Sequence, residues 1–393
     1  MVTSNVQDVL GDTSLDIVVE VIGGTDSPAR DLVLGSAASG KSVVTANKAL
    51  LAASLPELKR AFTSRRRALG YEASVAGGIP IIRAMQHSLL PDTVRSVQGI
   101  LNGTSNYILG SMAEGQPFAA ALAAAQAAGF AEADPTADVA GHDACNKLVI
   151  LTQLAYGCHV PPSQVRTQGI TGITPFDVQA AKASGYAIKH LGVSTLFEKA
   201  EQQQQQQPTL KRPRQLLDMF VSPALVPLGG SFASTGGAGN LVVVDSEALG
   251  RSSYGGAGAG REATANSILA DLVAIAKGSI SARPFPRPAP ARLGLTIKPS
   301  NTLRRLMYVR GPQEVTNLLS MALWRQGREL APCSGQEEDS ATGLRLKAFM
   351  VDASAGELTS LVARAARKVA APAASNVTEQ QVTELMAVYP VLK

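Results

Sequence analysis

Four acidic side chains and one lysine form the densest group of chemically active residues, within the segment AEADPTADVAGHDACNKL. Glu132, Asp134, Asp138 and Asp143 fall within twelve residues, and Lys147 follows Asp143 by four. If GHDACNKL is helical, Asp143 and Lys147 lie on one face, one turn apart. A lysine beside a carboxylate can transfer a proton when burial tunes the ammonium. Spacing alone favours the simpler alternative, a solvated ion pair of the kind common on helix surfaces.

Three further segments have residue types that suit ligand binding. In YEASVAGGIPI (71–81), Glu72 and carbonyl groups of a turn after a strand could hold a hard cation, although a plain tight turn is favoured. YGGAGAGREATA (254–265) resembles a glycine-rich phosphate loop before a helix, but no clear strand of a βαβ unit precedes it. In NGTSNYI, Thr104 or Ser105 is predicted to be a helix N-cap rather than a catalytic group.

The composition limits the class of protein. The 393 residues are 45% hydrophobic and 17% charged, which excludes a wholly disordered chain. The net charge of +5 is spread along the sequence, so we expect no nucleic-acid partner. No apolar run is long enough to span a membrane, and the first residues do not resemble a secretory signal. Three cysteines, Cys145, Cys158 and Cys333, form no disulfide framework and suit a reducing compartment.

The elements that must position the polar residues begin with an alternation of strands and helices. Apolar runs at 16–22 and 42–47 alternate with helical stretches at 28–40 and 48–70, and YEASVAGG follows as a further strand. The runs do not alternate between apolar and polar residues, as expected for strands covered on both faces. This order predicts a parallel α/β sheet.

The middle of the sequence predicts mainly helices. Most of residues 79–170 is expected to be helical, above all 118–130 and 141–157, and a strand at 241–249 precedes a late helix at 260–278.

Two low-complexity segments lie in the second half of the sequence. Six glutamines at 202–207 predict a polar insertion, and proline-rich residues 282–296 predict a linker. Beyond the linker, strand-like and helical segments in the order βαββαβ predict a ferredoxin-like domain over 297–393.

Taken together and in order, six segments resemble the homoserine dehydrogenase family, and NGTSNYIL and the pattern EADPxxDVxGxDxxxKL are the most specific. They are VVEVIGG (18–24), GKSVVTANKALLA (40–52), YEASVAGGIPII (71–82), GILNGTSNYIL (99–109), GFAEADPTADVAGHDACNKL (129–148) and YGGAGAGREATA (254–265).

The resemblance implies an α/β fold with three domains. A partial Rossmann dinucleotide-binding domain is expected at 1–77, to which residues 254–281 return. An α+β substrate-binding and dimerisation domain is expected at 78–253, and the ferredoxin-like domain at 297–393 would be of ACT type.

The implied activity is the NAD(P)-dependent interconversion of L-homoserine and L-aspartate 4-semialdehyde, in threonine, methionine and isoleucine biosynthesis. By the resemblance, Lys147 is the acid/base and Asp143 orients both Lys147 and the substrate. Glu132 matches the glutamate that binds the amino end of the substrate, and Asp138 belongs to the same pocket.

The resemblance also implies NADP or NAD as cofactor, a monovalent cation (Na⁺ or K⁺), a homodimer, and a place in the cytoplasm or the plastid stroma. The cofactor side would include Lys48 beside the nicotinamide and the backbone of Gly129 and Gly260. The cation site would carry over onto Glu72, Val75, Gly77 and Ile79.

The main departure from the family leads to a second hypothesis. A family member should begin with a strand and a GxGxxG loop for the pyrophosphate, and neither precedes DIVVEVIGG here. We therefore expect an N-terminally truncated member with a degenerate ACT-like domain, which would be a poor dehydrogenase on its own. The alternative function is a catalytically impaired fragment or non-catalytic relative that acts as a dimerising or regulatory binding protein.

Overall fold

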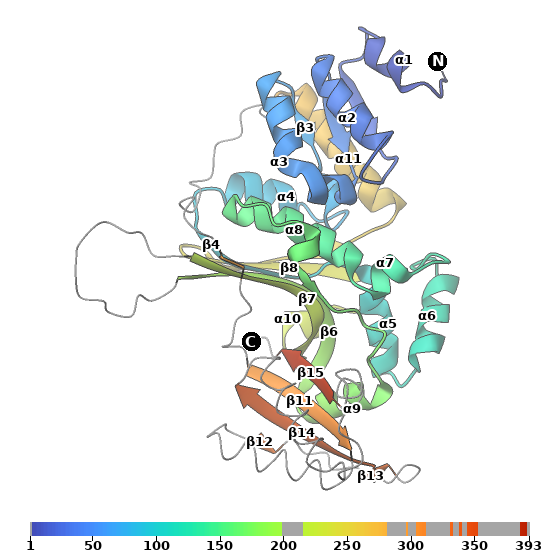
Figure 1. Cartoon of the computed structure of the whole chain (residues 1–393), viewed down its shortest axis with the longest axis vertical. Helices are drawn as coiled ribbons and strands as arrows, with labels where there is room; N and C mark the ends of the chain where they lie inside the picture. Colours follow the sequence, from blue (N-terminus) through green and yellow to red (C-terminus); the bar gives the residue numbers. More distant parts are fainter. Residues whose placement is uncertain are drawn as a thin grey trace, which may run out of the picture.

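The computed structural model describes residues 2–198 and 215–280, together with strand segments at 296–297, 304–311, 331–332, 338–339, 344–352 and 386–390. Three sheets follow one another along the longest axis of the molecule (Figure 1). Within the described part of the chain, no helix has the length and apolar character needed to cross a membrane. The glutamine insertion and nearly all of the proline-rich linker lie outside the described residues.

The first sheet is parallel and contains the predicted apolar runs. Its strands β1 (Ile17–Glu20), β2 (Ser42–Thr45) and β3 (Leu69–Gly70) lie in the order β1-β2-β3. Val18 pairs with Val43, and Val43 pairs with Leu69, so an apolar row crosses the sheet. The predicted α/β order of this region is therefore confirmed, although each strand is shorter than its apolar run.

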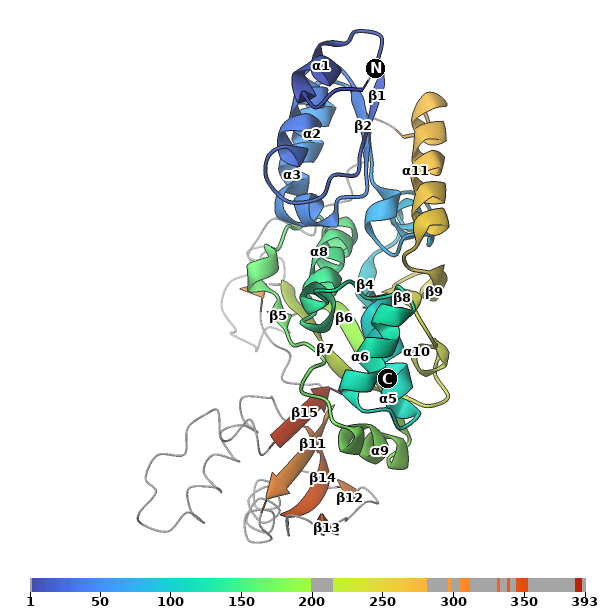
Figure 2. The same cartoon turned by 90° about the vertical axis from the view of Figure 1, so that its right-hand side faces the viewer.

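Helices cover both faces of the first sheet. α2 (Ala29–Ala38) and α3 (Lys48–Ser64) lie on one face, with α1 (Val6–Gly11) beside α2. α11 (Arg261–Ala276), from much later in the sequence, packs on β2 and β3 from the other face (Figure 2). The late helix α11 therefore returns to the N-terminal region and covers the face of the sheet that α2 and α3 leave open.

Side chains at the carboxyl ends of β1 and β2 fix the start of α3. The buried Glu20 carboxylate accepts hydrogen bonds from the Thr45 hydroxyl, at 2.6 Å, and from the Ile22 amide, at 2.7 Å. Asn47 caps α3 by accepting from the Leu50 amide, and its Nδ2 donates to the Gly24 carbonyl at 2.8 Å. Lys48, the first residue of α3, is thereby held at the sheet edge where ligands of α/β proteins bind.

The second sheet has seven strands, in the order β10-β7-β6-β4-β8-β9, with β5 also paired to β7. Along the path from β7 to β9 each strand is antiparallel to the next, whereas β5 and β10 pair with β7 in parallel. The bounds are β4 Val94–Ile100, β5 Arg166–Thr167, β6 Tyr186–Glu198, β7 Gln215–Pro227, β8 Gly239–Ser246, β9 Gly250–Ala257 and β10 Thr296–Ile297.

The strand β4 corrects the prediction of a mainly helical segment from 79 to 170. β4 lies between β6 and β8, and its residues Val94, Val97 and Ile100 are buried. Exposed Arg95 and half-buried Gln98 interrupt the apolar run, and a register irregularity lies between Val94 and Ser96. The sequence therefore lacks the simple alternation by which a strand is recognised.

Helices lie on the second sheet and join it to the first region. α8 packs on β4, β6 and α3, and one hydrophobic core extends from Leu50 and Leu55 of α3 to Leu148 and Leu151 of α8. The bounds are η1 Glu72–Ser74, α4 Ile81–Arg83, η2 Ala84–Ser88, α5 Gly103–Ala113, α6 Phe118–Ala127, α7 Thr136–Val139, α8 His142–Tyr156, η3 Pro162–Gln164, α9 Pro175–Ala183 and α10 Ser231–Ser234.

Of two predictions about glycine-containing segments, the first is wrong and the second is confirmed. YEASVAGG is not a strand: β3 ends at Gly70 and residues 72–74 form a 3₁₀ turn, since the Glu72 amide donates to Asp271 of α11 instead of a neighbouring strand. The second segment, YGGAGAGREATA, begins within β9, a strand of mostly polar and glycine residues. β9 is antiparallel to β8, so the segment is not part of a βαβ unit.

The third sheet is antiparallel, with the order β12-β14-β11-β15 and β13 paired to β14. This strand order is consistent with the predicted ferredoxin-like pattern. The predicted helices of this region lie outside the described residues, so the ACT-type assignment stays a prediction. The bounds are β11 Arg304–Gly311, β12 Ala331–Pro332, β13 Glu338–Asp339, β14 Leu344–Asp352 and β15 Met386–Pro390.

Candidate functional site

The predicted pair on α8 is buried. Lys147 Nζ lies 2.8 Å from Asp143 Oδ2, one helical turn away. Asp143 is 4% exposed and Lys147 is 7% exposed. A solvated surface ion pair, the simpler alternative for this spacing, is therefore excluded. Burying two charges is costly unless they are paired and hydrogen-bonded, so this pair needs the further partners described below.

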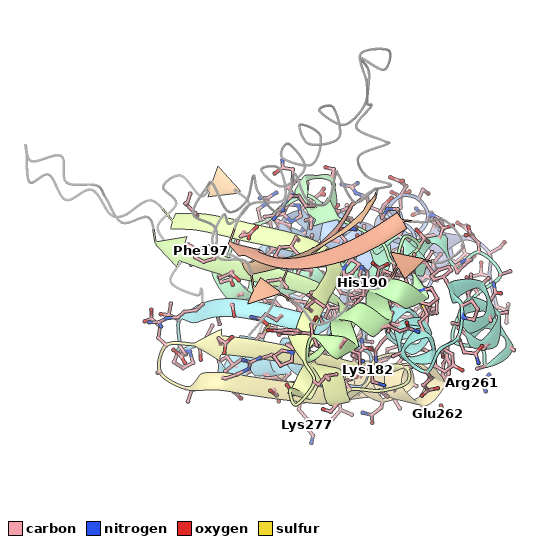
Figure 3. All side chains as sticks on the ribbon, turned by 90° about the horizontal axis from the view of Figure 1, so that it is seen from below. Lys182, His190, Phe197, Arg261, Glu262 and Lys277 are labelled. Carbon is pink, nitrogen blue, oxygen red and sulfur yellow. The ribbon has the colours of Figure 1, made fainter. Side chains whose placement is uncertain are left out.

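The backbone at the start of α8 packs against His190 of β6. Gly141 has a φ of 88°, and a Cβ at this position would lie 3.0 Å from the ring of His190. His190 Nε2 lies 3.0 Å from the Gln168 carbonyl, and burial lowers the pKa of the imidazole to about 4. Figure 3 labels His190 among the central ribbons. A neutral histidine thus packs against the glycine that begins the helix carrying Asp143.

A second lysine reaches the same carboxylate from the first region. Lys48 Nζ lies 2.8 Å from Asp143 Oδ1, so each oxygen of Asp143 faces one ammonium group. The side chain of Lys48 is 45% exposed, in contrast to 9% for Lys147. The packing of α3 on α8 brings these residues together, although they are far apart in the sequence. Lys48 is thus the more open member of the cluster.

Asn102 is a site residue that the sequence analysis missed. Its Nδ2 donates to Asp138 Oδ1 at 2.6 Å and to Asp143 Oδ2 at 2.8 Å. Its Oδ1 accepts from the Ser105 amide at 2.8 Å, so Asn102 is the N-cap of α5. The prediction that Thr104 or Ser105 caps this helix is wrong, because α5 begins at Gly103. An asparagine just before GTS is itself a strong N-cap signal, which could have identified Asn102 as the cap but not its contacts with the two carboxylates.

The residue before Asn102 holds the lysine. Lys147 Nζ donates to the Leu101 carbonyl at 2.8 Å, in addition to its contact with Asp143. Two adjacent residues at the end of β4 thus fix both members of the α8 pair. An ammonium has three N–H groups, so one donor of Lys147 remains for a substrate oxygen.

Opposing effects set the charges of the cluster. Burial raises the pKa of Asp143, but Lys147 and Lys48 outweigh it and hold that pKa well below its usual range. Burial lowers the pKa of Lys48, and the Asp143 carboxylate outweighs this and raises it. Both groups therefore stay charged at neutral pH. For Asp138, burial raises the pKa, opposed by the hydrogen bond from Asn102.

Of the other three predicted site residues, only Glu132 has a described interaction with this cluster. Glu132 is exposed in the segment between α6 and α7, and its charge contributes to the raised pKa of Lys48. Gly129 follows α6 with a φ of 74°, and Gly260 caps α11 with a φ of 115°. Neither glycine takes part in the described hydrogen bonds of the cluster. Glu132 alone among these three acts electrostatically on it.

The predicted cation residues lie in a buried turn near α11. Glu72 Oε1 and Oε2 accept from the amides of Ile82 and Arg83, each at 2.9 Å. Burial raises the pKa of the Glu72 carboxyl to about 7. The Gly77 carbonyl accepts from the Ser267 hydroxyl at 2.7 Å. Among the described residues, no group of three or more His, Cys, Asp and Glu side chains is arranged to bind a metal ion.

This turn contains carboxylate and carbonyl oxygens, the ligand atoms that hard cations prefer. Each carboxylate or carbonyl oxygen has a second lone pair after accepting one hydrogen bond. Val75 and Ile79 are buried in the same turn, and Ala76 between them has a φ of 53°. The donor chemistry therefore fits a monovalent cation bound by carbonyl and carboxylate oxygens.

Two family models match the chain. One, described as homoserine dehydrogenase, matches residues 80–273. The other, described as the NAD-binding domain of homoserine dehydrogenase, matches residues 1–72. The Lys147–Asp143 pair lies in the first match and Lys48 in the second, so the cluster joins the two matched regions.

Known proteins of the same family are similar to this chain. A homoserine dehydrogenase of Mycobacterium leprae is 44% identical over 281 residues, or 71% of this chain and 61% of the relative. The Pseudomonas aeruginosa enzyme is 41% identical over the same shares. A solved homoserine dehydrogenase from Thiobacillus denitrificans has a TM-score of 0.81 and 31% identity, covering 100% of this chain and 85% of that one. The chain spans about 61% of the length of the two curated relatives.

Proposed function

Because the chain belongs to the homoserine dehydrogenase family, we propose that it catalyses the NAD(P)-dependent interconversion of L-homoserine and L-aspartate 4-semialdehyde. The observation that carries this proposal is the buried Asp143 with an ammonium group 2.8 Å from each of its oxygens. One ammonium comes from the region that matches an NAD-binding domain, and the other from the region that matches the catalytic domain. Such a cluster suits a reaction in which a proton moves beside a bound dinucleotide.

Lys147 moves the proton at the substrate oxygen. In the reductive direction its free N–H donates to the aldehyde oxygen as that oxygen gains negative charge. In the oxidative direction the neutral amine accepts the proton of the homoserine hydroxyl. Asp143 and the Leu101 carbonyl hold Nζ in place, each at 2.8 Å, and thereby limit the orientations it can adopt. The nicotinamide supplies or accepts the hydride when it is bound.

Acidic groups around Lys48 bind the amino end of the substrate. Glu132 is exposed, so its carboxylate is free to pair with a substrate ammonium. Asp138 is half-buried and fixed by Asn102 at 2.6 Å, which makes it the more rigid of the two acids. We assign Glu132 the main contact and Asp138 a supporting one, because an open carboxylate loses less solvation before it pairs.

The cofactor is NADP or NAD, held by the region that matches the NAD-binding domain and by α11. Lys48 stands at the carboxyl edge of the first sheet, where dinucleotides bind in such folds. Gly260 is exposed and has no side chain to cap α11, so the first amides of this 16-residue helix are open to an anionic or polar ligand group. Gly129, which follows α6 with a φ of 74°, contributes backbone on the cofactor side. These residues fit a nicotinamide dinucleotide.

A monovalent cation is assigned to the turn that contains Glu72, Val75, Gly77 and Ile79. The ion would offset the cost of the buried Glu72 carboxylate, whose amide contacts leave its charge only partly compensated. Its contribution is structural, because it would stiffen the turn against which α11 packs.

The remaining family properties complete the proposal. The domain limits are those predicted from the sequence, with an ACT-type domain at the C-terminus. The functional unit is a homodimer formed through the substrate domain. The activity places the protein in the cytoplasm or the plastid stroma, the compartments of threonine, methionine and isoleucine biosynthesis.

The experiment is a steady-state assay of residues 1–393 with L-homoserine and either NAD or NADP. We expect reduced cofactor to form with L-homoserine, but slowly, because no GxGxxG loop precedes β1 in this sequence. No reduction is expected with L-serine, which lacks one methylene group. Fluorescence titration of the reduced dinucleotide, run in parallel, separates loss of binding from loss of chemistry. A protein that binds neither dinucleotide, or that binds one without turnover of L-homoserine, would sink the proposal.

A further inference from the structure

A third buried lysine lies outside the cluster. Lys189, on β6, is 6% exposed, and no ion pair in the described part of the chain includes it. Its Nζ donates to Asn106 Oδ1 at 3.0 Å and to the Thr235 carbonyl at 2.8 Å. A buried ammonium that has only neutral partners is costly, and burial lowers the pKa of this lysine to about 8. A methionine would fill the same space without that cost.

Asn106, which accepts a hydrogen bond from Lys189, also contacts the loop formed by residues 235–239. Asn106 Nδ2 lies within hydrogen-bond distance of three carbonyl groups, those of Thr235, Gly237 and Gly239, at 3.1, 2.9 and 3.3 Å. A Cβ on Gly103 would come within 2.5 Å of the Ala238 carbonyl oxygen, so backbone of the loop touches the start of α5. Lys189 and Asn106 therefore fasten residues 235–239 to α5 at several points.

The contact between residues 235–239 and α5 lies between the two halves of the proposed site. On one side, α5 is preceded by its N-cap Asn102, which donates to Asp138 and Asp143. On the other side, Asn240 lies against Gly258, where any Cβ would overlap the Asn240 carboxamide. Gly258 in turn lies against Gly77 and precedes the cap of α11 by two residues. The loop thus connects the proton-transfer cluster with the glycine-rich segment on the cofactor side.

We propose that Lys189 is a positioning residue for the reaction: with Asn106 it clamps residues 235–239 and so sets the spacing between the Asp143–Lys147 pair and the segment 257–260. This inference rests on the proposed function, which it deepens. Hydride transfer requires near-contact geometry, and a misplacement of about 1 Å can cost ~100-fold in rate. Charge-assisted hydrogen bonds are stronger and shorter than neutral ones, which is the advantage of an ammonium here over an apolar side chain.

The test compares Lys189→Met with Lys182→Met in the full chain. Lys182 is an exposed lysine near the end of α9, labelled in Figure 3, and it controls for loss of a positive charge. For Lys189→Met we expect kcat to fall by ~10- to 100-fold. The KM for homoserine and the dissociation constant of the reduced dinucleotide should stay within about threefold of the parent, since no binding group is lost. The melting temperature should change little, because the removed desolvation cost offsets the lost hydrogen bonds.

Two results would overturn the inference. One is a kcat of Lys189→Met close to that of the parent. The other is a parallel loss of kcat, cofactor binding and melting temperature, which would indicate a purely structural residue. If Lys189→Met does not fold, Asn106→Leu tests the same clamp by the same criteria. If both fold, the double variant should be no slower than the worse single variant, because each breaks the same device.

A readout without turnover separates this inference from the proposed function. Amide hydrogen exchange of residues 235–240 should be faster in Lys189→Met than in the parent and in Lys182→Met. If the parent shows no homoserine-dependent reduction, the proposed function fails, and the exchange rates still decide whether the clamp exists. Unchanged exchange in this segment would contradict the clamp whatever the activity.

Discussion

Two buried carboxylates in this molecule have opposite surroundings. Asp143 and Glu72 are each 4% exposed. Asp143 faces the ammonium groups of Lys48 and Lys147, which keep its pKa below the usual range despite burial. Glu72 faces two backbone amides, and burial raises its pKa to about 7. Equal burial thus gives opposite electrostatic outcomes, because full charges compensate a carboxylate more strongly than peptide dipoles do.

The comparison indicates that the Asp143 cluster has a catalytic role and the Glu72 turn a structural one. The Asp143 cluster brings together charged side chains from α3, α7 and α8, which suits proton transfer. The Glu72 turn ties β3, α4 and α11 together through backbone contacts, which suits stiffness and a bound cation. Changes at the first should therefore affect turnover, and changes at the second should affect stability.

The largest effect is expected for Lys147→Ala. Loss of a general acid/base group typically lowers turnover by ~10²–10⁴-fold. Binding of the reduced dinucleotide should stay nearly unchanged, because Lys48 remains on the cofactor side. Stopped-flow or steady-state rates against a fluorescence titration provide the comparison, with Lys182→Ala as the control. Rates of Lys147→Ala within a few-fold of the parent would remove the assigned role.

A smaller effect is expected for Glu132→Gln. A substrate ammonium loses a charged partner, which can cost about 1.5–3 kcal/mol, and the exposure of Glu132 places the effect near the lower limit. The homoserine KM should therefore rise by roughly tenfold. The cofactor KM should change less. Glu114→Gln, an exposed acid just after α5, is the matched control. Equal effects on both substrates would count against a substrate contact.

The stability of the Asp143 cluster should depend on pH with a defined sign. The folded pKa of Asp143 lies below its unfolded value, so its ionised form stabilises the fold above about pH 4. This contribution decreases as the pH falls through the folded pKa. Asp143→Asn should therefore be less stable than the parent at neutral pH, and the gap should narrow in strong acid. Denaturant unfolding at several pH values measures it; a gap that widens in acid would contradict the assignment.

The smallest effect concerns the cation turn. If a monovalent ion occupies it, Na⁺ or K⁺ should raise the melting temperature by a few degrees over tetramethylammonium at equal ionic strength, the size expected for about 1 kcal/mol of linkage. The rise should be lost in Glu72→Gln and kept in Lys147→Ala. Equal melting temperatures in all three salts would contradict a bound cation and would mean that Glu72 only caps α4.

Local features of the site could be predicted from the sequence, and long-range ones could not. The spacing of Asp143 and Lys147 sets their contact, because one helical turn separates them. Lys48 entered the site only through the family resemblance, since no local rule joins α3 to α8. Asn102 was missed because a carboxylate contact across the fold depends on how α5 meets α7 and α8, and the same holds for the buried Lys189.

The fold shows the same limit. The strands β1 and β2 and the helices α2, α3, α6 and α8 follow from apolar runs, caps and glycines, and they were predicted. β4 was missed, because Arg95 and Gln98 break its pattern. The long strand β7 (Gln215–Pro227) was not among the predicted elements, and it pairs along its whole length with β6. Pairing partners far along the chain decide such segments, and local propensity does not.

The most direct test of the central claim, that Lys147 moves the proton, is chemical rescue of Lys147→Ala. Homoserine-dependent cofactor reduction would be measured with increasing methylammonium, and with methanol as a neutral control of similar size. We expect turnover to be very low without the amine and to rise with amine concentration, because a small amine can take the place of the lost side chain, while methanol has no effect. Turnover near the parental rate without any amine would contradict the account.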